Sequence, residues 1–226
     1  MSAPISVIIP TRNAADQIGP TLAALVEGVG EGLIAEVILS DGGSGDDIAQ
    51  IAEEVGAQFL TGEPGRGGQL ARGAAAARAP WLLFLHADSV PGPGWTTPVS
   101  AHLGHPKHAG YFDLRFDSAA WQARALARWA NLRSRLARLP YGDQGLLIAR
   151  TLYDAAGGFA DIPLMEDVAL ARALRTSLRP LDHPILTSPR RYEQEGWAAR
   201  AVGNGWLLAQ YLAGRDPSAL ARKYRS

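Results

Sequence analysis

Asp88 is a carboxylate placed where it could bind a metal ion. It follows the apolar segment Trp81–Leu85 in the order His86, Ala87, Asp88. Carboxylate oxygens are ligands that Mg²⁺ and Mn²⁺ prefer, and such a cation could bridge to the oxygens of a diphosphate. The same side chain could instead cap the turn before Pro91. Both interpretations stay open from the residues alone.

A second candidate for chemistry is the carboxylate pair Glu166 and Asp167, which follows Asp161–Met165 at the expected start of a helix. One of the two could be a general base that removes a proton from an attacking hydroxyl. Neighbouring helical residues point about 100° apart, so one would catalyse and the other would bind or orient. The helix macrodipole alone also favours acidic residues at this position.

Two glycine-containing turns could contact a nucleotide. In the first, Asp41 could bind a base or ribose while Gly42 and Gly43 let the backbone approach the ligand, although a plain turn has the same composition. In the second, Gly65–Gly68, Arg66 and backbone amides could bind a phosphate at a helix start. This second turn lacks the ending of a Walker motif.

An arginine pair, Arg190 and Arg191, follows Thr187–Pro189 in an expected extended loop. Two guanidinium groups suit a diphosphate, although exposed arginines are commonly just solvated. The five histidines show no spacing of a metal site, and no Gly-x-Ser-x-Gly motif supports serine hydrolysis.

The elements that must position these residues alternate between strand and helix in the first 85 residues. Apolar, β-branched runs predict strands over Ile5–Ile9, Glu36–Ser40, Ala57–Leu60 and Trp81–Leu85, with helices between them. This alternation predicts an open parallel α/β sheet. Ligands bind beyond the carboxyl ends of such strands, which points to the loops Pro10–Asn13, Asp41–Ser44 and His86–Ser89.

The order changes after Gly94. We expect helices over Trp95–Leu103, Ala119–Leu139, Glu166–Thr176 and Trp197–Leu212, and strands over Tyr111–Phe116, Leu146–Ala149 and Pro184–Thr187. No linker or internal repeat is visible. The expectation is therefore one domain over residues 1–226, with a nucleotide-binding half at about 1–92 and an acceptor-side half at about 93–226.

The composition excludes several classes of protein. The chain has 226 residues, 47% of them apolar, 19% charged and none cysteine, which excludes extensive disorder, disulfides, zinc–thiolate sites and a cysteine nucleophile. The net charge of zero gives no support to nucleic-acid binding. However, residues 1–113 carry 5 basic and 12 acidic side chains, whereas residues 114–226 carry 17 and 10, which hints at a positive face in the second half.

The expected helix over 119–139 has arginines on one stripe and apolar residues on the next. The arginines are Arg124, Arg128, Arg135 and Arg138, and the apolar stripe is Ala125, Trp129, Leu132, Leu136 and Leu139. Such a helix could rest on an anionic membrane or be a surface helix with a solvated basic face. No apolar run reaches the roughly 20 residues of a membrane span, and no signal peptide is apparent. We expect a cytoplasmic protein, with peripheral contact at the inner face of the membrane left open.

In their order, the motifs of this chain resemble those of family 2 glycosyltransferases with the GT-A fold, and more narrowly a small bacterial subgroup of single-domain enzymes. The resemblance spans residue 4 to about 225. It is carried by Ile5–Asn13, Val37–Ser44, Gly65–Gly67, Leu85–Asp88, Tyr141–Gly145, Gly157–Phe159, Pro163–Asp167 and Thr187–Arg191. It implies a Rossmann-like α/β fold, with an open, mostly parallel sheet flanked by helices and a helical acceptor-side C-terminal part.

The resemblance also implies a role for each matched residue. Asp167 would be the catalytic base, supported by Glu166, and Asp88 would be the metal ligand. The residues implied to bind the nucleotide-sugar are Pro10, Thr11, Asn13, Asp41, Arg66, Gly67, His86, Ala87, Asp88 and Arg191, with Arg190 as an alternative to Arg191 at the diphosphate. Those implied at the sugar and acceptor site are Tyr141, Asp143 and Gln144.

The implied reaction is an in-line displacement with inversion at the anomeric carbon of a UDP- or GDP-sugar. Asp167 deprotonates the acceptor hydroxyl while a divalent cation, Mn²⁺ or Mg²⁺, and an arginine stabilise the departing diphosphate. The acceptor is not identified by the sequence, and the basic helix permits a lipid-like one.

One position departs from the family pattern, because His86 replaces the first carboxylate of the Asp-x-Asp metal motif. A neutral imidazole can still bind a transition metal. The alternatives are a non-catalytic relative that binds a nucleotide or a partner, and a sugar-phosphate nucleotidyltransferase. The second would need a glycine-rich loop after the first strand, which Pro10–Asn13 does not provide.

Overall fold

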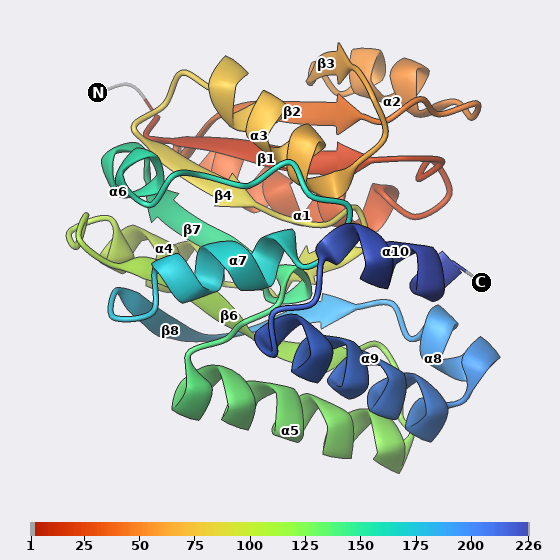
Figure 1. Ribbon diagram of the computed structural model, residues 1–226. Coiled ribbons are helices and arrows are strands. Elements are labelled where there is room, and N and C mark those ends of the chain that lie inside the picture. Colours follow the sequence, from red (N-terminus) through yellow and green to blue (C-terminus); the bar gives the residue numbers. More distant parts are fainter. Residues whose placement is uncertain (1–2, 226) are drawn as a thin grey trace.

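The computed structural model describes residues 3–225, in which eight strands form one sheet with helices on both faces (Figure 1). The strand order is β3-β2-β1-β4-β7-β6-β8-β5. The strands are β1 (Ile5–Thr11), β2 (Ile34–Asp41), β3 (Gln58–Thr61), β4 (Trp81–Phe84), β5 (Ser89–Pro91), β6 (Ala109–Phe116), β7 (Leu146–Ala149) and β8 (Leu178–Thr187).

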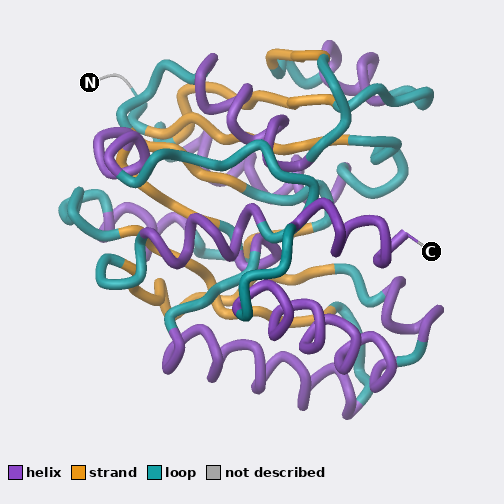
Figure 2. The backbone as a smooth tube through the Cα atoms, in the orientation of Figure 1, coloured by secondary structure: helices purple, strands orange, loops and turns teal. Residues whose placement is uncertain are grey.

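The helices connect these strands and cover the sheet (Figure 2). They are α1 (Gly19–Gly30), α2 (Ile48–Glu54), α3 (Arg66–Ala76), α4 (Thr96–His102), α5 (Trp121–Ala137), α6 (Arg150–Ala155), α7 (Glu166–Ala173), α8 (Arg190–Glu195), α9 (Trp197–Leu212) and α10 (Pro217–Arg225), with the 3₁₀ turn η1 (Gly142–Gln144). No helix in residues 3–225 is long and apolar enough to cross a membrane.

The first half of the sheet is parallel, as the sequence predicts. β1 pairs in parallel with both β2 and β4, and Ile8 lies opposite Ile38 on one side and Phe84 on the other. Ile8 and Ile9 are fully buried, because helices pack on both faces. Side chains of α3 and α7 share one core cluster with Ile8, and those of α1 and α4 share the other with Ile9. Continuous apolar runs are typical of strands covered in this way.

The second half of the sheet is mixed. β7 runs antiparallel to β4 and β6, β8 runs parallel to β6, and β5 runs antiparallel to β8. β7 reverses direction because η1, which directly precedes it, already lies at the edge where β4 ends. The predicted α/β fold is therefore confirmed, and its parallel character is concentrated in β1–β4.

One predicted local conformation is wrong. Arg190 and Arg191 begin helix α8 and do not lie in an extended loop. The backbone N–H of Arg190 donates to Ser188 Oγ at 3.3 Å, which helps to start the turn. Tyr192 then packs on Phe116 and Trp197, with ring centroids 5.1 and 5.2 Å apart. The segment turns helical because this aromatic cluster holds it against β6.

Helix α3 packs so closely on β1 that residue 73 has no room for a side chain. A Cβ at Gly73 would overlap Cγ2 of Ile8. We expect Gly73→Ala to lower the free energy of unfolding by about 1–3 kcal/mol, measured by urea denaturation. Gly30→Ala in α1 is the matched control, because a Cβ there meets nothing within 4 Å. Equal stability of the two variants would contradict this packing.

Candidate active site

A cleft of about 560 Å³ opens at the carboxyl ends of β1 and β4, the edge that the sheet topology predicts for a ligand. Segments far apart in the sequence contribute to it. Its lining includes Pro10–Ala14, Gly65, Arg66, Gln69, His86–Asp88, Tyr141–Asp143, Met165–Asp167, Ser188, Arg190–Tyr192, Arg200, Asn204 and Leu207. The predicted residues that reach this cleft are therefore Pro10, Thr11, Asn13, Arg66, His86, Ala87, Asp88, Tyr141, Asp143, Glu166, Asp167 and Arg191.

Asp41 is buried and does not line the cleft, and the contact with a base or ribose expected for it stays a prediction. Its side chain is 2% exposed. It accepts hydrogen bonds from Thr11 Oγ1 at 3.0 Å, from the backbone N–H groups of Gly43 and Ser44 at 2.8 Å, and from Ser44 Oγ. Burial acts to raise the pKa of Asp41, but these hydrogen bonds outweigh it and the pKa is lowered. Asp41 therefore shapes the loop that carries Thr11.

Gln69 fixes the edge of the sheet beside this loop, a role that the sequence did not reveal. It is buried, and its Nε2 donates to the backbone oxygens of both Thr11 and Ser40 at 2.8 Å. The side chain thus joins the ends of β1 and β2. Asn13, in the cleft, has a positive φ of 49°, and its backbone N–H donates to Ser44 Oγ at 2.8 Å. These bonds hold the predicted nucleoside loop in one shape.

Gly67 is not among the residues that line the cleft, and its expected contact with the nucleotide stays a prediction. A Cβ at this position would overlap the backbone oxygen of Ala160. The glycine is required because α3 crosses the segment before α7 at close range. Arg66, next to it, does line the cleft, and its Nη1 lies 3.4 Å from Oε1 of Glu166.

His86 and Asp88 follow β4 and lie in the cleft. Burial, together with the positive charges of Arg66 and Arg191, lowers the pKa of His86 well below its usual value, so the imidazole is neutral. Burial raises the pKa of Asp88, against the opposing effect of the same arginines. Gly142 lies against the imidazole, because a Cβ there would be 2.5 Å from Nε2 of His86.

Asp143 and Tyr141 enter the cleft from the loop around η1. Burial raises the pKa of Asp143 to about 6, and the nearby carboxylates of Asp167 and Asp88 add to the effect against the opposing charge of Arg133. Oδ1 of Asp143 is buried and has no hydrogen-bond partner within residues 3–225, so it is available to a ligand. The guanidinium carbon of Arg133 lies 3.5 Å from the centre of the Tyr141 ring.

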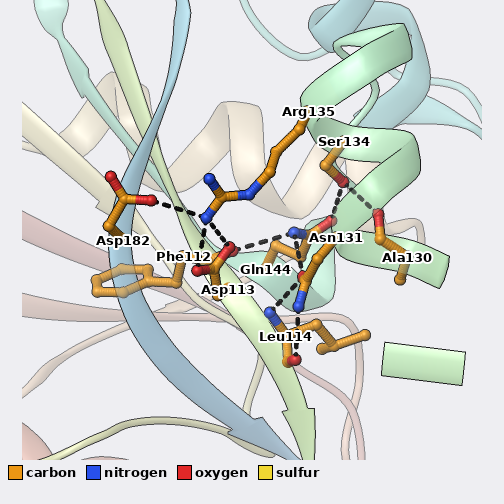
Figure 3. A network of polar contacts seen from close by, with 9 residues as sticks. All are labelled: Phe112, Asp113, Leu114, Ala130, Asn131, Ser134, Arg135, Gln144 and Asp182. Carbon is orange, nitrogen blue, oxygen red and sulfur yellow. Dashed lines mark hydrogen bonds and ion pairs between the residues drawn. The ribbon is translucent and has the colours of Figure 1, made fainter. Parts of the chain in front are cut away.

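Gln144 does not line the cleft, and its expected place at the sugar and acceptor site stays a prediction. It is fully buried, with its side chain turned towards α5 (Figure 3). Ser134 Oγ donates to its Oε1 at 2.6 Å, and its Nε2 donates to the backbone oxygen of Phe112 at 3.0 Å and to Asn131 Oδ1 at 3.4 Å. The side chain turns inward because these buried partners satisfy it, and it thereby anchors the loop that presents Tyr141 and Asp143.

The carboxylates of Glu166 and Asp167 at the start of α7 have different surroundings. Asp167 is partly exposed and lines the cleft, and its Oδ2 accepts a hydrogen bond from the backbone N–H of Gly142 at 2.8 Å. Glu166 is 2% exposed. Burial, with the negative charge of Asp167, raises the pKa of Glu166 against the effect of Arg66. Met165, before the pair, has a positive φ of 68°, a strained conformation of the kind found at functional sites.

Helix α9 completes the wall of the cleft with residues that were not predicted. Arg200, Asn204 and Leu207 of α9 line it, and their i, i+4, i+7 spacing places them on one helical face. That spacing was the available signal. Arg190 forms an ion pair with Asp16 at 3.0 Å, whereas Arg191 is exposed at the cleft.

Comparison with known proteins identifies the family. A family model described as glycosyl transferase family 2 matches residues 6–160. The chain belongs to glycosyl transferase family 2. It is a glycosyltransferase, and its sheet and flanking helices match the GT-A fold. No curated protein sequence matches this glycosyltransferase.

Several solved structures have a fold similar to that of this glycosyltransferase. Glucosyl-3-phosphoglycerate synthase from Mycobacterium tuberculosis, in complex with Mn²⁺, UDP and glucosyl-3-phosphoglycerate, is 21% identical with a TM-score of 0.57, and the match covers 82% of this chain and 70% of that one. TarS 1–349 from S. aureus is 15% identical with a TM-score of 0.64, covering 84% and 62%. TarS 1–349 in complex with UDP-GlcNAc is 16% identical with a TM-score of 0.62, and the match covers 82% of this chain and 58% of that one.

The raised pKa of Glu166 makes the stability of the glycosyltransferase depend on pH. Its usual pKa of 4.5 rises to about 7 in the folded protein, so the folded state binds this proton more tightly. The tighter binding of this proton by the folded state therefore raises the free energy of unfolding at low pH. This stabilisation is lost as the pH rises from about 4.5 to about 7. Glu166→Gln removes this dependence. We expect the free energy of unfolding of the variant, relative to that of the parent, to rise by on the order of 1–3 kcal/mol between about pH 5 and about pH 8.

The measurement is urea denaturation of both proteins at the two pH values. Glu53→Gln is the control, because it removes a carboxyl group from the exposed side of α2. A stability difference between Glu166→Gln and the parent that stays constant with pH would contradict the assignment.

Proposed function

We propose that the protein transfers a sugar from a nucleoside-diphosphate sugar to an acceptor hydroxyl, with inversion at the anomeric carbon and Asp167 as general base. The observation that carries the proposal is the common cleft of Asp88 and Asp167, which also contains Arg66 and Arg191. A partly exposed carboxylate can accept a proton there, while cationic groups stabilise a departing diphosphate.

The donor is proposed to bind along the edge of β1, α3 and β4. Pro10, Thr11 and Asn13 would contact the nucleoside, and Arg66, Ala87 and Arg191 would lie along the diphosphate. The hydrogen bonds from Thr11 to Asp41 and from Asn13 to Ser44 support this, since they hold the β1 loop at the cleft. The similar structures include complexes with UDP and with UDP-GlcNAc, which favours the uridine diphosphate sugar over the guanosine diphosphate sugar as the donor.

A divalent cation, Mn²⁺ or Mg²⁺, fits these residues only with help from the substrate. Residues 3–225 contain no cluster of three or more His, Cys, Asp or Glu side chains that could hold a metal by itself. Mg²⁺ is commonly held by one or two carboxylates together with substrate phosphates. Asp88 would supply one ligand, and a cation there would neutralise charge on the diphosphate. The Mn²⁺ in similar structures agrees with this reading.

The roles of the two α7 carboxylates follow from their surroundings. Asp167 is the more accessible, and the hydrogen bond from Gly142 orients its Oδ2. It accepts the acceptor proton as the hydroxyl oxygen bonds to the anomeric carbon, while the bond from that carbon to the diphosphate oxygen breaks and the diphosphate keeps the electron pair. Glu166, buried beside Arg66 at 3.4 Å, positions this arginine and the start of α7.

The acceptor is proposed to enter beside Tyr141 and Asp143, from the second half of the chain. We propose a division near residue 92 between a nucleotide-binding half and an acceptor-side half. Because His86 replaces a carboxylate, a second candidate function is nucleotide binding without transfer. The two functions differ in whether a nucleotide-sugar is consumed.

The base assignment predicts a separation of binding from chemistry. Asp167→Asn should retain nucleoside diphosphate binding and lower transfer by at least about 100-fold, since general acid–base catalysis contributes about 10²–10⁴-fold. Asp154→Asn, an exposed change on α6, should leave both unchanged. Nucleotide-sugar turnover and calorimetric binding measure the two quantities. Substantial residual transfer by Asp167→Asn would contradict the assignment.

The metal assignment predicts that nucleotide binding depends on Asp88. A ligand at about 100 times its Kd should add roughly 2.7 kcal/mol of stability, visible as a rise in melting temperature with UDP or GDP plus Mn²⁺. This rise should disappear after chelation and in Asp88→Asn. Equal stabilisation with and without metal would contradict the role of Asp88.

A further inference from the structure

Helix α5 is amphipathic in the reverse of the usual sense. Small residues face the protein, namely Ala123, Ala127, Ala130 and Ser134. The large apolar residues instead face solvent, with exposed fractions of 68% for Trp121, 63% for Trp129, 47% for Leu132 and 75% for Leu136. A helix on the surface of a globular protein usually buries such a stripe. The apolar stripe therefore needs an explanation outside the core.

Helix α9, which contacts α5, also exposes large apolar side chains. α5 and α9 contact each other and lie side by side in Figures 1 and 2. On α9, Val202 is 72%, Trp206 59% and Leu212 45% exposed. We call these seven residues the α5–α9 face: Trp121, Trp129, Leu132, Leu136, Val202, Trp206 and Leu212.

The charges carried by helices α5 and α9 themselves have one sign. Residues 118–140 and 196–215 contain arginines but no Asp or Glu. Arg124 and Arg128 are exposed and lie beside the apolar stripe on α5, as 3.6 residues per turn requires. Arg135 is different, because it pairs with Asp113 at 2.8 Å and Asp182 at 2.7 Å (Figure 3).

We propose that the α5–α9 face docks the protein on an anionic phospholipid surface. Tryptophan is enriched at the boundary between headgroups and acyl chains, and interfacial helices combine apolar residues with a basic flank. Arg124 and Arg128 would contact lipid phosphates while the apolar side chains insert between headgroups. A second copy of this chain is a poorer occupant, since packing two such faces together would bring arginines towards arginines without an acidic partner.

The α5–α9 face adjoins the cleft. The opposite side of α9 presents Arg200, Asn204 and Leu207 to the cleft, so a bilayer on the outer side of α9 would lie beside its wall. An acceptor hydroxyl carried by a lipid would then be within reach of Asp167. This last step rests on the proposed function, whereas docking on the membrane does not.

Co-sedimentation of the full chain with vesicles tests the docking. We expect binding to vesicles of phosphatidylcholine with phosphatidylglycerol, weak binding to phosphatidylcholine alone, and a blue shift of tryptophan fluorescence on binding. Trp129→Ser with Trp206→Ser should reduce binding at least about tenfold. Arg124→Glu with Arg128→Glu should also reduce binding at least about tenfold, since each basic residue near an anionic surface raises the binding affinity about fivefold.

The matched control is Val26→Ser with Val29→Ser on α1, because these valines are also exposed, at 67% and 57%. This pair should bind vesicles like the parent. Failure of the parent to bind anionic vesicles, or equal binding by all variants, would overturn the proposal. The proposal would also be overturned if light scattering showed that the parent forms a stable dimer and that Trp129→Ser with Trp206→Ser is a monomer. If the parent binds anionic vesicles but transfers no sugar, the result would count against the proposed function and not against docking on the membrane.

Discussion

The constraint on which the rest of the structure depends is the burial of β1 and β4 on both faces. Their side chains are apolar throughout, apart from Ser6 and Thr11, so helices must cover both sides and the connections must cross over the sheet. Parallel strands then end at one edge. Polar residues that follow these strands in the sequence, such as Asn13 and Asp88, are thereby brought into one cleft although 75 residues separate them.

A second layer of polar contacts gives the cleft its shape. Three buried side chains support its shape: Asp41 closes the loop after β1, Gln69 joins β1 to β2, and Gln144 ties the η1 loop to α5. Gln69 also lines the cleft, whereas Asp41 and Gln144 do not. Buried hydrogen bonds of this kind are costly to leave unsatisfied, so each holds one loop in one conformation. The groups that do line the cleft are positioned by these contacts.

The sequence predicted the first half of the fold well, because the spacing of apolar residues and the local composition are signals that short segments carry by themselves. The strands before Asn13 and Asp88 follow from apolar runs, and the edge rule places both of these loops at the cleft. The burial of Asp41 and Gln144 could not be predicted, because whether a polar side chain points into a cleft or under it depends on partners distant in sequence. The close approach of Ala160 to Gly67 is also a contact between distant segments. The exposed stripe of α5 was visible as a pattern, but its orientation depends on the small residues Ala123 and Ala127 packing on β6.

The central claim is that the cleft holds a nucleoside diphosphate through a cation on Asp88. Anomalous diffraction from crystals grown with Mn²⁺ and UDP or GDP tests it most directly. We expect an anomalous peak within coordination distance of a carboxylate oxygen of Asp88, with the diphosphate between this peak and Arg191. A nucleotide bound elsewhere, or a peak away from Asp88, would contradict it.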